Sequence, residues 1–160
     1  MLIISGTMAG CSVSHRVSSR VKFIEEFIRF IEFIKSEIRY SSAALKDIIS
    51  KYDSDSCISE YIKQCICLIS NQYSFESAWN LSIDNIPANV GLEKRDIELI
   101  KSFGCGLGKS DTYGQISHCE LNIELMKSVL DAARDNQEKK CKLYVMLGTF
   151  SGAALSVMFI

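Results

Sequence analysis

Apolar residues recur every three or four positions along most of the chain, and this spacing predicts a series of α-helices. A long first helix is predicted over residues 16–40, because a wide apolar face there leaves the polar residues in a narrow stripe. Shorter helices are predicted over residues 43–52, from 58 to about 70, over 75–86 and over 92–103, with a loop at 87–91. A further helix follows a glycine-rich turn and runs unbroken into the last segment. No segment alternates with the period of two that a strand requires, so an all-α fold of about six helices is expected.

The last segment of the chain differs from the middle in carrying no charge. Residues 143–160 are uncharged, and as a helix they would be about 27 Å long, against a membrane hydrocarbon core of about 30 Å. Lys139, Lys140 and Lys142 stand immediately before this run. Basic residues favour the cytoplasmic side of a membrane. The pattern therefore predicts a C-terminal transmembrane helix over residues 143–160 that starts in the cytoplasm.

The first segment is also uncharged but shorter. Residues 1–14 carry no charge, and the basic residues His15, Arg16 and Arg20 come after them. A secretory signal peptide has its positive charges before the apolar stretch, so export is not expected. The charge order instead predicts a short transmembrane helix over residues 1–15 with its downstream end in the cytoplasm. On length alone, the alternative is a buried first helix of a soluble domain.

Each terminal segment contains a G-x-x-x-G pair, Gly6 with Gly10 and Gly148 with Gly152. Small residues at this spacing let membrane helices approach closely. We therefore expect the two segments to pack as a pair, either within one chain or between copies in a homo-oligomer. The resulting arrangement is a membrane hairpin with both termini outside and a helical domain, residues 16–142, in the cytoplasm.

Composition and charge exclude several functions. The net charge is −1 and no block of like charge is present, which argues against nucleic-acid binding. The seven cysteines follow neither a disulfide framework nor a zinc motif. The adjacent His118 and Cys119 are better explained as packed side chains than as metal ligands. No residue lies in a recognisable nucleophile or general-base context, so no catalytic residue, metal or cofactor is predicted.

Three glycines at alternate positions, Gly104, Gly106 and Gly108, separate the last two predicted helices. Glycine adopts positive φ without the steric cost of a Cβ atom, so these residues are predicted to form a structural turn. Asp111 and Gln115 follow the turn, and Thr112-x-x-Gln115 has the spacing of a capping box. Asp111 and Gln115 are therefore either helix caps or contacts to a partner.

The same stretch contains Gly108-Lys109-Ser110, which invites comparison with a phosphate-binding P-loop. The P-loop requires a glycine five residues before Gly108, and Phe103 occupies that position. It also requires a strand upstream, where a helix is predicted. A small nucleotide-binding enzyme built on this turn is kept as the less favoured alternative.

Taken in order, these residues resemble the stage III sporulation protein AB family of endospore-forming bacteria. The resemblance spans nearly the whole chain and rests on four pieces: Glu37-Ile38-x-Tyr40, Ala78-Trp79, Phe103-Gly104-x-x-Leu107-Gly108-x-x-Asp111-x-x-x-Gln115 and Leu147-Gly148. The third piece is the specific one. Two features differ from the family pattern, a shorter N-terminal membrane segment and Ala44 in place of a proline.

The resemblance implies a non-enzymatic component of the channel complex that joins mother cell and forespore. Members of the family are similar to the platform proteins of type II secretion and type IV pilus systems. The implied partners are the membrane, a secretion-type ATPase (stage III sporulation protein AA) and the other stage III A channel components. The implied location is the mother-cell membrane around the forespore. A membrane-tethered adaptor unrelated to sporulation is the alternative within the same broad class.

Overall fold

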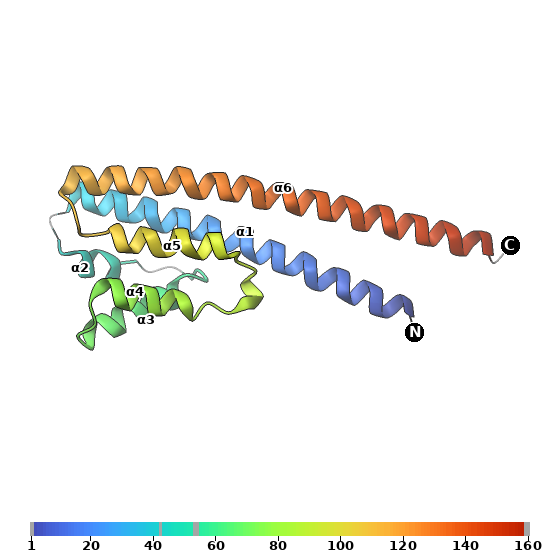
Figure 1. Ribbon diagram of the computed structural model, residues 1–160, viewed down its shortest axis with the longest axis horizontal. Helices are drawn as coiled ribbons and strands as arrows, with labels where there is room; N and C mark the ends of the chain where they lie inside the picture. Colours follow the sequence, from blue (N-terminus) through green and yellow to red (C-terminus); the bar gives the residue numbers. More distant parts are fainter. Residues whose placement is uncertain (1, 42, 53–54, 159–160) are drawn as a thin grey trace.

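The computed structural model describes the backbone of residues 2–41, 43–52 and 55–158, and the side-chain surroundings of residues 18–41, 43–52 and 55–139. Two long helices form its main axis, α1 (Leu2–Tyr40) and α6 (Thr112–Met158). They run antiparallel, so both termini lie at one end of the molecule (Figure 1). The α1–α6 pair is the most extensive helix contact in the described part of the chain.

Four shorter helices lie along one side of this pair, at the end away from the termini (Figure 1). They are α2 (Leu45–Ser50), α3 (Ser59–Ser70), α4 (Phe75–Asp84) and α5 (Lys94–Gly106), with a 3-10 turn η1 (Ala88–Val90) before α5. The described residues thus contain six α-helices and no strand, which confirms the predicted all-helical fold.

Aromatic side chains fill the centre of the bundle. Phe27 and Phe30 from α1, Trp79 from α4 and Phe103 from α5 are all buried. The Phe30 and Trp79 rings stack with centroids 6.0 Å apart, and Phe27 meets Phe103 edge-on at 5.6 Å. The Trp79 indole N–H donates a hydrogen bond of 2.9 Å to the Ile100 carbonyl, so the one polar atom of that ring is satisfied inside the core.

A buried ion pair fixes the start of α5 against α1. The guanidinium of Arg20 donates to both carboxylate oxygens of Asp96, at 2.8 and 3.0 Å, and also to Glu93. Asp96 is fully buried and accepts a further hydrogen bond from the Glu93 N–H, which completes a capping box at the helix start. The apolar pattern gave no indication of this pair, because its members are 76 residues apart.

The predicted turn of three glycines is corrected at two positions. Gly104 and Gly106 lie inside α5, which extends beyond the predicted end at Phe103. They are needed for close packing: a Cβ atom on Gly104 would lie 2.1 Å from Trp79 Cδ1, and one on Gly106 would lie 2.3 Å from His118 Cε1. Only Gly108 of the three has a positive φ, +77°. The turn between the helices is therefore residues 107–111.

The predicted membrane segments, residues 1–15 and 143–160, fall outside the residues whose side chains are described, as do the packing predictions for Gly6, Gly10, Gly148 and Gly152. In the part of the chain that the structure describes, no helix combines the length and the apolar character needed to cross a membrane.

Candidate functional site

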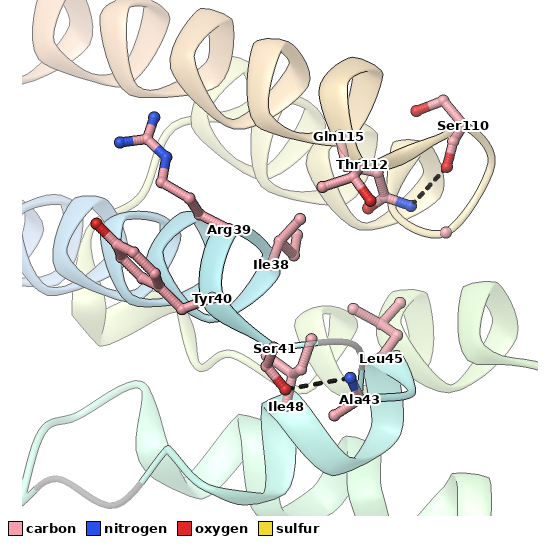
Figure 2. A pocket seen from close by; sticks show the side chains of 11 residues that line it. Ile38, Arg39, Tyr40, Ser41, Ala43, Leu45, Ile48, Ser110, Thr112 and Gln115 are labelled. Carbon is pink, nitrogen blue, oxygen red and sulfur yellow. Dashed lines mark hydrogen bonds between the residues drawn. The ribbon is translucent and has the colours of Figure 1, made fainter.

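A pocket of about 640 Å³ lies at the end of the bundle opposite the termini. Three elements enclose it: the last turn of α1, the start of α2, and the turn from α5 into α6 (Figure 2). Its described lining residues are Ile38, Arg39, Tyr40, Ser41, Ala43, Leu45, Ile48, Gly108, Ser110, Thr112 and Gln115. This volume is typical of pockets that accept a ligand or a few side chains of a partner.

The antiparallel register of α1 and α6 brings these segments together. The ammonium nitrogen of Lys35 on α1 lies 3.7 Å from a carboxylate oxygen of Glu120 on α6. Five residues further along α1 is Tyr40, and five residues back along α6 is Gln115. Because both helices rise by the same distance per residue, Tyr40 and Gln115 lie at the same level. The end of the first long helix thus faces the beginning of the last.

The first turn of α6 is held by the two polar residues singled out in the sequence. The Asp111 carboxylate accepts a hydrogen bond of 2.9 Å from the Gly114 N–H, and its carbonyl accepts from the Gln115 N–H. Asp111 is therefore the N-cap, and the capping box predicted from Thr112 to Gln115 does not form. The Gln115 amide instead donates to the Ser110 carbonyl at 3.2 Å (Figure 2). That bond shapes the wall of the pocket.

Gly108 sets the direction of the chain beside the pocket. Leu107, directly after α5, is buried, and Gly108 then turns the backbone with a left-handed φ of +77°. A side chain at Gly108 would be strained by this φ, although space is available, since the nearest atom to an added Cβ would be Leu45 Cδ2 at 3.6 Å.

Lys109, the residue that would contact phosphate in a P-loop, is engaged elsewhere. Its ammonium lies 3.0 Å from the Glu76 carboxylate on α4. The hydrogen bond from Lys109 lowers the pKa of the Glu76 carboxyl. The segment before the turn is α5, where a P-loop has a strand. The geometry at Lys109 thus explains this residue as a tie between α4 and the turn.

His118 and Cys119 are packed apart rather than aimed at a common point. The His118 ring stacks on Phe103 with centroids 5.6 Å apart, and its Nε2 lies 3.0 Å from the Phe103 carbonyl. Cys119 is fully buried, and burial raises the pKa of its thiol to about 11. Within the described ranges, no group of three or more acidic, histidine or cysteine residues could hold a metal ion.

Several pocket residues are not distinguished by the sequence pattern. Arg39 appears in it only as part of the first predicted helix. Ser110 and Thr112 appear only as parts of the turn and of the cap predicted after it. The two segments that form the pocket, around Tyr40 and around Gln115, are nevertheless both pieces of the one resemblance. The register that brings these two pieces together depends on the pairing of α1 with α6, which the sequence pattern does not contain.

Two comparisons match the chain to known proteins, and a third finds no match. The family model described as stage III sporulation protein AB matches residues 1–160. The chain is 21% identical over 162 residues to stage III sporulation protein AB of Bacillus subtilis (strain 168), an alignment that covers 98% of this chain and 94% of that relative. No solved structure matches the chain.

Proposed function

Because the chain belongs to the stage III sporulation protein AB family, we propose that it is a non-enzymatic platform component of the channel complex between mother cell and forespore. In this role both ends are anchored in the mother-cell membrane as a hairpin. The helical domain extends into the cytoplasm and docks a secretion-type ATPase, stage III sporulation protein AA, beside the other stage III A components.

The register of α1 and α6 is the observation that carries this proposal. A guanidinium nitrogen of Arg134 on α6 lies 2.6 Å from a carboxylate oxygen of Glu25 on α1. Ten residues from this pair toward the N-terminus is His15, which adjoins the uncharged first segment. Ten residues toward the C-terminus is Tyr144, at the start of the uncharged last segment. Because both helices rise by the same distance per residue, His15 and Tyr144 lie at the same level along the helix pair. Two apolar segments that start at one level of an antiparallel pair are suited to enter one membrane together.

The same register supports a docking role for the pocket end of the bundle, opposite the termini. From Tyr144 to Gln115, α6 spans about 43 Å at 1.5 Å per residue. The pocket would therefore lie well clear of the lipid headgroups, where a cytoplasmic protein can reach it. No catalytic constellation accompanies the pocket in the described residues, so its proposed work is to bind and orient a partner.

Binding of the purified ATPase to the full-length chain in nanodiscs tests this proposal. We expect a saturable complex with a Kd in the micromolar range or tighter, as for specific transient interfaces. Empty nanodiscs are the control. Equal ATPase retention on loaded and empty nanodiscs would contradict the docking role.

A further inference from the structure

The pocket at the end of the bundle away from the termini carries a charge that no other described residue neutralises. The charged residues around it are paired: Lys35 with Glu120, Glu37 with Lys51 at 3.0 Å, and Lys109 with Glu76. Asp111 is occupied as the cap of α6, and the neighbouring Lys46 and Asp47 on α2 carry opposite charges.

Arg39 is the charged residue among the described residues that line the pocket. It is exposed and has no ion pair or hydrogen bond with another described residue. Arginine presents five N–H donors in a planar fork that matches a carboxylate. An unpaired guanidinium at the rim of a pocket therefore complements an acidic group on whatever binds there.

The neighbouring side chains offer apolar contact beside this charge. Tyr40 is 83% exposed at the end of α1, while Ile38, Leu45 and Ile48 line the pocket (Figure 2). Tyrosine and arginine are enriched at the centres of protein interfaces because they combine large contact area with polar recognition. An exposed Tyr40 next to an unpaired Arg39 has this character.

We propose that the pocket is the docking site for an acidic segment of a partner protein, with a carboxylate on Arg39 and an adjacent apolar side chain packed against Tyr40. This inference rests on the proposed function in assigning that segment to the ATPase. The chemistry of the segment follows from the pocket itself. Asp111 and Gln115 then contribute indirectly, by holding the α6 wall of the pocket in place.

Two variants of the full-length chain test the site by ATPase binding in nanodiscs. Arg39→Glu and Tyr40→Ala are each expected to raise Kd at least tenfold. Arg29→Glu and Tyr73→Ala are the matched controls, since Arg29 is an exposed arginine on α1 and Tyr73 is an exposed tyrosine between α3 and α4. Both controls are expected to bind like the wild type. All four substitutions are at exposed side chains, and unchanged melting temperatures would show that folding is intact.

A charge swap identifies the chemistry of the occupant. An Asp or Glu to Lys change in the docking segment of the ATPase is expected to weaken binding to the wild type and to restore binding to Arg39→Glu. Wild-type affinity in Arg39→Glu and Tyr40→Ala would overturn the docking site while leaving the proposed function intact.

Photo-crosslinking separates the site from the identity of the partner. With p-benzoylphenylalanine in place of Tyr40, sporulating cells are expected to give an adduct to a peptide that contains Asp or Glu, and Arg39→Glu should abolish it. If that peptide belongs to another protein and the ATPase does not bind, the result supports the docking site and contradicts the proposed docking of the ATPase. An adduct to lipid, or the same adducts from positions 40 and 73, would overturn the site.

Discussion

At the scale of single residues, close packing explains more of the specific sequence than turn geometry does. Gly104 lacks a side chain because the Trp79 ring occupies that space, and Gly106 because the His118 ring does. Gly108 is required for its backbone conformation. The sequence revealed that these glycines matter, but glycine is selected both for positive φ and for close approach. Only the arrangement of α4, α5 and α6 distinguishes the two reasons.

We predict that Gly104→Ala lowers the free energy of unfolding more than Gly106→Ala or Gly108→Ala. The added methyl group would meet a buried, hydrogen-bonded ring at Trp79, an overpacking that costs about 1–3 kcal/mol or more. At Gly106 the obstructing His118 ring is only half-buried and can move more easily. At Gly108 the cost is the left-handed φ, about 1–2 kcal/mol. Urea unfolding of the three variants measures this order, and a smaller loss at Gly104 would contradict it.

Alkaline pH is predicted to destabilise the fold through two buried thiols. Burial raises the pKa of Cys65 and of Cys119 from 9.0 to about 11. Below pH 9 both thiols are protonated in the folded and the unfolded chain. Between pH 9 and 11 only the unfolded chain loses these protons, so stability falls with rising pH, by up to about 1.4 kcal/mol per pH unit for each thiol.

The double variant Cys65→Ala, Cys119→Ala isolates this effect. It should be less stable than the wild type at pH 8, because of lost packing, and the difference should narrow by pH 11. Denaturant unfolding at both pH values measures the difference. An unchanged difference would show that the two thiols do not ionise on unfolding in this range.

At the scale of helices, apolar periodicity predicted the elements well and their ends less well. The predicted long helix up to Tyr40 and the long helix after the turn correspond to α1 and α6. The predicted second helix, residues 43–52, shortens to Leu45–Ser50, and the fifth extends to Gly106. Helix ends depend on caps and tertiary contacts, which periodicity does not contain. For the same reason the contact of α5 with α1 through Arg20 and Asp96 was not predicted.

Arg20→Met is predicted to destabilise the attachment of α5 by about 3–5 kcal/mol, because it leaves the buried carboxylate of Asp96 without its charged partner. Lys101→Met is the control, since it removes an ion pair to Asp84 at the surface and should cost less than about 1 kcal/mol. Hydrogen exchange should show the first turn of α5 opening in the Arg20 variant. Equal losses of stability in the two variants would contradict a special role for the buried pair.

At the scale of the whole molecule, one antiparallel pair of long helices relates the two ends of the chain to the pocket. The pocket could not be predicted from periodicity, because it forms where two segments about 75 residues apart meet at the same level of that pair. Two of the segments that line it, around Tyr40 and around Gln115, belong to the pieces that carry the family resemblance. The membrane hairpin remains a prediction from charge and apolar length, which the α1–α6 register supports.

The most direct measurement of this account is the trypsin accessibility of the domain in membranes that contain the full-length chain. The lysines and arginines of residues 16–142 should be protected in sealed spheroplasts and cleaved in inverted membrane vesicles. This result is expected because both ends would enter the membrane from the cytoplasmic side. Recovery of the intact chain in the soluble fraction after lysis, or cleavage of the domain in sealed spheroplasts, would contradict the proposed platform.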